Sequence, residues 1–192
     1  MSNVILRSSL PLVIVLSCLT PVTYVLAQEA PTTQEGSAEK PKAAEATDFK
    51  KLKELLPETV ASLKRSGAEG SKQSVGEMKI SQARGTYGEE DKEANASVTI
   101  IDYGAMPGMA NSVAPWQTLE IDNESDNDYS RTVTINGYKA IENYNKESKS
   151  GSLMLMVGSR FMVTIEINSL PADTLKKAGE TLKLKELEAL AK

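Results

Sequence analysis

The chain has 192 residues, a formal net charge of −4, one cysteine and no histidine. This length fits one domain of common size together with targeting sequence. Without imidazole, Ser-His-Asp and Cys-His triads and histidine-ligated zinc sites are excluded, and the negative charge excludes bulk attraction to nucleic acid.

The first 27 residues have the pattern of a secretory signal peptide. Arg7 precedes an uncharged run over residues 10–26, and the run ends in the cleavage pattern VLA. We place the cleavage after Ala27, which predicts a periplasmic or secreted protein. In the alternative, Cys18 becomes the acylated N-terminus of a membrane-anchored lipoprotein, although the chain after Cys18 stays apolar where a lipid tether would be polar.

Removal of the signal peptide would leave little catalytic chemistry. The mature chain would hold 21 basic and 26 acidic residues, a net charge of −5, with neither thiol nor imidazole. We therefore expect no disulfide, no cofactor and no enzymatic activity. A carboxylate-dependent hydrolase of envelope polymers is the alternative, because glycoside hydrolysis needs no histidine, but one Trp and two Phe offer few aromatic platforms for sugars.

Residues 28–47, QEAPTTQEGSAEKPKAAEAT, contain no aromatic and no large aliphatic side chain. Such a segment cannot bury enough apolar surface to offset the entropy lost on ordering. We predict a disordered leader here. The remaining residues, 48–192, are predicted to form a single domain.

A helix is predicted at the start of this domain. In DFKKLKELL (48–56) the apolar residues recur at helical spacing behind Thr47 or Asp48 as a cap. Residues 58–65 (ETVASLKR) predict a further helical turn, and the glycines of residues 67–70 mark its end.

A β-hairpin and an irregular segment follow. Residues 77–87 and 96–104 are predicted to be the two strands of the hairpin. Glycine and proline then interrupt the pattern in residues 104–120, where Asn111 or Ser112 is expected to cap a short helix.

Met106, Met109 and Trp116 make residues 104–119 a candidate binding surface. Methionine and aromatic side chains in an exposed loop can receive a small apolar ligand or a partner protein. The alternative is that Trp116 anchors the short helix to the sheet. The segment is not a phosphate loop, because it lacks the Gly-Lys-Ser/Thr ending of that motif.

Two further patterns suggest metal ions. The pairs Met106/Met109 and Met154/Met156 offer thioethers to Cu(I), yet the second pair falls on one face of a strand, where methionine commonly fills a core. The acidic segment 120–128 suggests calcium, but it lacks the glycine and the glutamate that a helix-loop-helix calcium site requires. We expect no metal centre, and metal buffering by the methionines or the acidic loop is an alternative function.

Four more strands and a helical end complete the domain. The strands are predicted at residues 130–136, 138–145, 152–157 and 160–167. Asn136-Gly137 and Gly158-Ser159 are dipeptides that close tight hairpins. A helix is predicted to start near Pro171, with a short helical piece after it. The expected fold is an α+β domain, a mostly antiparallel sheet of about six strands packed by N- and C-terminal helices.

Arg160 lies between two apolar strands of this closing segment. Its guanidinium can bind an anion, or it can pair with a glutamate such as Glu142 on an adjacent strand. Hairpin geometry explains the glycine and apolar positions around it, so we assign the segment mainly to holding the fold. Arg160 is kept beside Met106, Met109 and Trp116 as a candidate ligand or partner residue.

The segments VTINGYKAIENY, SGSLMLMVGSRFMVTIEI and LPADTLKKAGETL are similar to the closing half of PsbP-like sandwich domains and of several secreted or lipoprotein families of bacteria. In these families an inner-glycine hairpin leads to paired strands and then to a packing helix. The resemblance covers the last third of the chain. It implies a non-catalytic binding or accessory module, here an exported one with a small apolar ligand or an envelope protein as its partner.

Overall fold

The computed structural model describes residues 45–76, 78–89, 91–104 and 109–191. The signal peptide with Ala27 and Cys18, most of the leader and Met106 lie outside these residues, so the expectations about them stay predictions. Among the residues described, no helix is long and apolar enough to cross a membrane.

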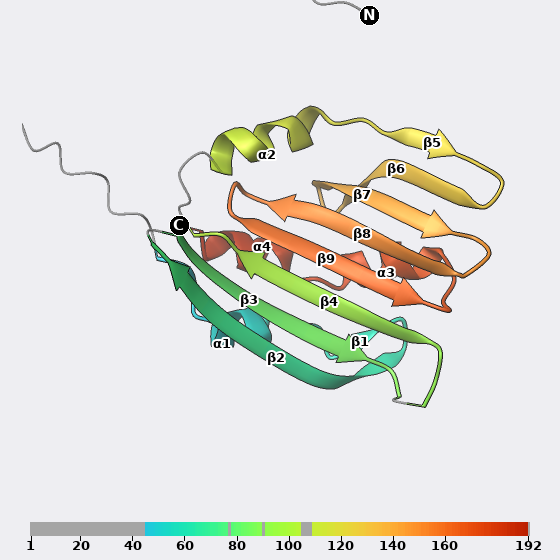
Figure 1. Ribbon diagram of the computed structural model, residues 1–192, viewed down its shortest axis with the longest axis horizontal. Coiled ribbons are helices and arrows are strands. Elements are labelled where there is room, and N and C mark those ends of the chain that lie inside the picture. Colours follow the sequence, from blue (N-terminus) through green and yellow to red (C-terminus); the bar gives the residue numbers. More distant parts are fainter. Residues whose placement is uncertain (1–44, 77, 90, 105–108, 192) are drawn as a thin grey trace, which may run out of the picture. The chain divides into compact units, whose positions relative to one another are not determined.

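Nine strands in the described part of the chain form one antiparallel sheet in the order β1-β2-β3-β4-β9-β8-β7-β6-β5 (Figure 1). The strands are β1 (Thr59–Val60), β2 (Leu63–Val75), β3 (Met78–Tyr87), β4 (Asn95–Asp102), β5 (Asp122–Glu124), β6 (Asp128–Ile135), β7 (Tyr138–Asn145), β8 (Ser150–Val157) and β9 (Phe161–Asn168). The helices described are α1 (Phe49–Glu54), α2 (Met109–Thr118), α3 (Asp173–Glu180) and α4 (Leu184–Ala189).

The sheet consists of two meanders joined by one long-range strand pair. β1 to β4 form the first meander, and the chain then passes through α2 to the opposite edge of the sheet, where β5 begins the second. The second meander ends at β9, which pairs with β4. This pairing sets Val98 opposite Ile165 and Ile100 opposite Val163, and all four side chains are buried.

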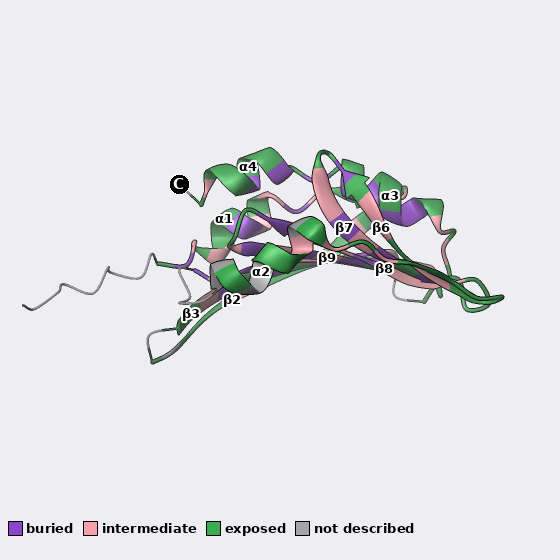
Figure 2. Ribbon diagram, turned by 90° about the horizontal axis from the view of Figure 1, so that it is seen from above, coloured by how far each residue is buried: buried purple, intermediate pink, exposed green. Residues whose placement is uncertain are grey.

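Helices α1, α3 and α4 lie on the same face of the sheet (Figure 2). Strand residues alternate, so one set points to these helices and forms the core with residues such as Leu52 of α1, Leu175 of α3 and Leu187 of α4. Full burial of one such leucine stabilises the fold by about 1.5–3 kcal/mol. The other set of strand residues points to the face that these three helices leave free, which Figure 1 views from the front.

The prediction of about six strands packed by N- and C-terminal helices is wrong. Over the ranges that the structure describes, the chain forms a single nine-stranded sheet with a few short helices. Residues 58–65, predicted as a helical turn, contain β1 and the start of β2, joined by a tight turn in which Ala61 and Ser62 adopt positive φ angles of 48° and 72°. The acidic segment 120–128, predicted as a loop, contains β5.

The glycines of residues 67–70 lie inside β2 and do not end an element. A Cβ atom at Gly70 would lie 2.6 Å from the Phe49 ring, and one at Gly67 would lie 2.8 Å from the Thr86 hydroxyl. Glycine is therefore used here for the close approach of neighbouring side chains, which is a recognised use of glycine within strands. Sequence alone does not separate this use from chain breaking.

The predicted turn at Asn136-Gly137 is confirmed. These residues connect β6 to β7 with φ angles of 50° and 91°, the left-handed pair that a type I′ hairpin needs. The hairpin of β8 and β9 also forms, with Gly158 at φ 60° in the turn. At the N-terminus of α1, the side chain of Asp48 accepts a hydrogen bond from the backbone N–H of Lys50, which makes Asp48 the cap.

Gly151 of β8 offers a test of the packing between sheet and helix. A Cβ atom there would lie 2.5 Å from the Asn143 carbonyl oxygen and 3.0 Å from Leu175. We expect Gly151→Ala to lower the free energy of unfolding by about 1–3 kcal/mol, because the backbone oxygen cannot move aside alone. Urea denaturation gives the value, with Ser150→Ala on the same strand as control. Equal stability of the two variants would contradict this packing.

Candidate functional site

We call the face of the sheet opposite α1, α3 and α4 the helix-free face. It carries a row of hydrogen-bonding side chains that crosses seven strands in register. Each member stands directly opposite the next on the neighbouring strand. We call this set the polar row, and its members in spatial order are Asn123, Ser130, Asn143, Ser152, Glu166, Ser97 and Thr86. It runs across the strands near the ends of β7 and β9, at the right-hand side of Figure 1.

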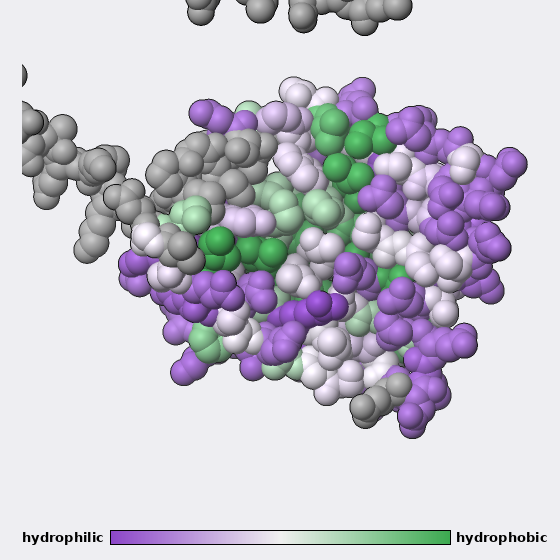
Figure 3. Space-filling view, viewed as in Figure 1, coloured by the Kyte–Doolittle hydropathy of each residue, from purple (hydrophilic) through white to green (hydrophobic). Residues whose placement is uncertain are grey.

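Two hollows follow the polar row. The first, of about 760 Å³, lies over β5 to β9 and includes Asn143, Ser152 and Glu166 in its lining. The second, of about 500 Å³, lies over β3 and β4 and includes Ser97. Glu166 and Asn168 line both hollows, so the two adjoin and are called here the trough. Figure 3 shows pale and purple, weakly to strongly polar surface at this side of the face.

Hydrogen bonds between side chains orient the polar row. The Ser97 hydroxyl donates to the Glu166 carboxylate over 3.0 Å, and the Arg84 guanidinium lies 3.6 Å from the same carboxylate. Asn143 donates to the Ser152 hydroxyl at 3.5 Å. The one charge within the row is therefore already balanced by a neighbouring cation, and the other members are neutral.

A second set of paired side chains borders the trough at the β5–β6 hairpin. Asn145 donates to the Asp128 carboxylate over 2.6 Å, and Lys146 donates to the Glu124 carboxylate over 2.7 Å. The hydrogen bond from Lys146 holds the pKa of Glu124 below its usual value. In the part of the chain that the structure describes, no three Asp, Glu, His or Cys side chains converge to hold a metal ion.

The opposite end of the same face is apolar. Met162 stands directly opposite Met156 on β8 and opposite Ile101 on β4, and Met154 lies two residues before Met156. Figure 3 shows green, hydrophobic surface on the part of this face that lies away from the polar right-hand side. The helix-free face therefore changes from polar to apolar along the strands.

Trp116 lies on α2, beside the apolar end. It lines a hollow of about 330 Å³ together with Tyr138, Met156 and Gly158. The backbone of Met109 begins α2, and Met106 lies outside the residues described. The structure thus brings Trp116 next to Met156, a neighbour that sequence reasoning did not pair with it.

Arg160 pairs with Asp102 at the end of the β4–β9 ladder. Its Nε and Nη2 atoms donate to the two carboxylate oxygens of Asp102 over 2.6 and 2.8 Å. Asp102 is fully buried, and the Arg160 side chain is 11% exposed. Of the two roles expected for Arg160, the structure shows an ion pair, and its partner is Asp102. Glu142 instead accepts two hydrogen bonds from Arg131.

This ion pair also holds the beginning of the domain. Arg160 Nη2 donates to the Glu45 carbonyl oxygen over 2.7 Å, and the backbone N–H of Thr47 donates to Asp102 over 2.7 Å. The backbone N–H of Gly104 donates to the same carboxylate. Asp102 therefore connects three segments that are distant in sequence, and its role is structural.

Comparison with protein-family models, curated proteins and solved structures finds no match to this chain. The resemblance of the last third to PsbP-like domains therefore stays a prediction.

Sequence reasoning placed the candidate surface at residues 104–119 and did not find the polar row. A weak signal was present, because Asn143 and Ser152 stand inside predicted strands, where β-branched residues are usual. Strand alternation puts such residues on one face. Which strands lie side by side, and in which register, was needed to join them into a row.

We expect Arg160→Ala to lower the free energy of unfolding by about 3–5 kcal/mol, because the substitution leaves the buried Asp102 carboxylate without its cation. Arg84→Ala serves as control: its side chain is 44% exposed, and loss of its pair with Glu166 is expected to cost less than about 1 kcal/mol. Urea denaturation measures both. Similar losses for the two variants would contradict a buried role for the Asp102 pair.

The buried Asp102 carboxylate is also expected to make the stability of the fold depend on pH. Burial raises the pKa of Asp102, but hydrogen bonds from Arg160, Thr47 and Gly104 outweigh burial, so the pKa lies below its usual value. A carboxyl with a lowered folded pKa stabilises the fold above its unfolded pKa, about 4, and this contribution is lost as the pH falls through the folded pKa. Urea denaturation at several pH values below 4 should show that the free energy of unfolding falls less steeply with decreasing pH for Asp102→Asn than for the wild type. An equally steep fall for both proteins would refute the role of Asp102 in acid sensitivity.

Proposed function

We propose that this is an exported, non-catalytic binding protein that takes a linear, hydroxyl-rich ligand, such as an oligosaccharide, along the polar row. The observation that carries the proposal is the register of the row, in which seven polar side chains face the same way on seven consecutive strands. Export rests on the signal-peptide pattern of residues 1–27.

The shape of the row favours an extended ligand. Neighbouring strands are about 4.8 Å apart, so seven strands place the outermost members about 30 Å from each other. The two hollows over the row adjoin at Glu166 and Asn168, near the middle of this length. A compact ligand would contact only a part of such a row, whereas a chain of several sugar units would contact most of it.

The side chains of the row favour a ligand that is rich in hydroxyl groups. Serine and threonine hydroxyls and asparagine amides each donate and accept hydrogen bonds, as sugar hydroxyls do. The Glu166 carboxylate adds an acceptor whose charge is already balanced by Arg84. The row itself offers a strongly charged ligand no charge except that of Glu166, and it offers a small apolar ligand no large apolar side chain.

Weak, additive binding is expected from such a surface. A hydrogen bond exposed to water contributes about 0.5–1.5 kcal/mol, and the members of the row are not aromatic, although Tyr129 and Tyr144 line the hollow over β5 to β9. Dissociation constants for short oligosaccharides should therefore be near the millimolar range, about −4 kcal/mol. Several such contacts along one polymer would raise the overall avidity.

Titration of the ¹⁵N-labelled mature protein with soluble hexasaccharides of β-1,4-linked glucose and N-acetylglucosamine tests the proposal. We expect NMR shifts at amides of the row, and an Asn143→Val, Ser152→Val variant that binds about tenfold more weakly, because two hydrogen bonds are worth about 1.4 kcal/mol.

Gln73→Val, Ser74→Val is the matched control, since both residues are exposed on β2 and neither lines the trough. This control should bind like the wild type. Absence of shifts with both sugars at about 10 mM, where ligands of millimolar affinity are mostly bound, would refute sugar binding. Cleavage of either sugar would refute the non-catalytic part of the proposal.

A further inference from the structure

We propose that Met154, Met156 and Met162 form a binding site for one soft monovalent metal ion, Cu(I), at the apolar end of the helix-free face. The three thioethers come from two adjacent strands, β8 and β9. Met162 of this site lies four residues before Glu166 of the polar row on β9. The proposal of a metal site is independent of the proposal of sugar binding.

The register brings the three side chains together. Met156 and Met162 are directly opposed, which places their Cβ atoms about 4.5–5.5 Å apart. Met154 lies on the same face as Met156, two residues earlier, and is the diagonal neighbour of Met162. Each methionine has three rotatable bonds, so three sulfur atoms at these positions can converge on a common point.

Packing against the helices does not account for these methionines. They have the opposite orientation to Leu153, Leu155 and Val163, which fill the core beneath the helices. Met154 and Met162 are partly exposed, while Met156 is 8% exposed. Partly exposed strand positions favour β-branched and aromatic residues, and methionine is not among these.

The chemistry of the site selects a soft ion. Thioethers bind Cu(I) and bind hard cations such as Ca²⁺ and Mg²⁺ poorly. The residues paired directly with Met154 and Met162 on the neighbouring strands are Ile101, Ile141 and Thr164, so these pairings add no carboxylate for a hard ion. The Tyr103 hydroxyl donates to the Met162 sulfur over 3.9 Å, so this sulfur already acts as an acceptor.

Trp116 supplies a readout, because it is the one tryptophan of the chain and lines a hollow with Met156. We expect Ag(I), a soft ion that is not oxidised in air, to quench its fluorescence with a one-to-one endpoint. Cu(I) supplied from a bicinchoninate complex should transfer to the mature protein with the same stoichiometry.

The deciding variant is Met154→Leu, Met156→Leu, Met162→Leu. Leucine keeps the volume and apolar character of each side chain, so far-UV circular dichroism and urea denaturation should show a folded protein. We expect this variant to lose both the quenching and the Cu(I) transfer, and a variant carrying Met162→Leu alone to bind more weakly than the wild type.

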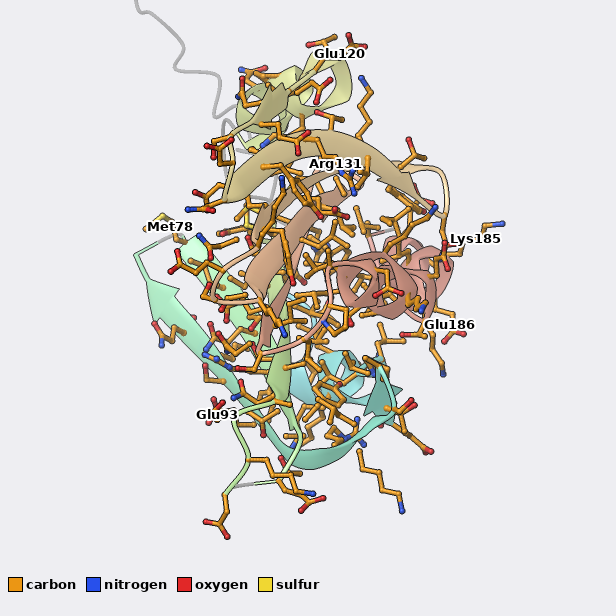
Figure 4. The ribbon with its side chains drawn as sticks, turned by 90° about the vertical axis from the view of Figure 1, so that its right-hand side faces the viewer. Met78, Glu93, Glu120, Arg131, Lys185 and Glu186 are labelled. Carbon is orange, nitrogen blue, oxygen red and sulfur yellow. The ribbon has the colours of Figure 1, made fainter. Side chains whose placement is uncertain are left out.

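Met78→Leu is the control: Met78 is 42% exposed and stands at the β2–β3 turn (Figure 4). It should bind both ions like the wild type. Wild-type protein that takes up neither ion would overturn the proposal. A triple variant that binds as the wild type does would also overturn it, because the ligands would then be other residues.

Discussion

The pairing of β4 with β9 is the constraint on which the rest of the structure depends. It joins two meanders that are separate in sequence and continues the register of each into the other. The buried ion pair between Asp102 and Arg160 closes one end of this ladder and also binds the start of the domain through Thr47. A slip of one residue in this pairing would turn every side chain of one meander to the opposite face.

Because helices cover only one face of the sheet, the two faces have different roles. Residues that point toward α1, α3 and α4 provide the buried apolar surface that stabilises the fold. Residues that point the other way do not contact these three helices, and several of them, such as Asn143 and Glu166, are exposed and can contact a ligand. On that face the side chains change from the neutral polar members around Ser152 to the thioethers around Met156 within the length of one strand. The two proposed sites thus share one face and differ in chemistry.

Features set by neighbouring residues, such as tight turns, were predicted correctly from the sequence. Features that depend on residues distant in sequence were missed. The turn at Asn136-Gly137 needs two left-handed residues in sequence, and so a dipeptide suffices to indicate it. β1 and β2 were missed because Gly67 and Gly70 resemble chain breakers until Thr86 and Phe49 are seen packed against them. The partner of Arg160 was missed for a similar reason, since Asp102 is 58 residues away in sequence.

The amino-acid sequence alone establishes the chemistry that is available: no imidazole in the chain, no thiol once a signal peptide ending at Ala27 is removed, and an excess of acidic residues. It also indicates the hairpins, because turn residues act on their immediate neighbours. The nine-strand order, the polar row and the meeting of Met156 with Met162 follow from tertiary structure. These features depend on pairing between distant strands, and the free energy of such pairing is set by burial across the whole sheet, which no short stretch of sequence contains.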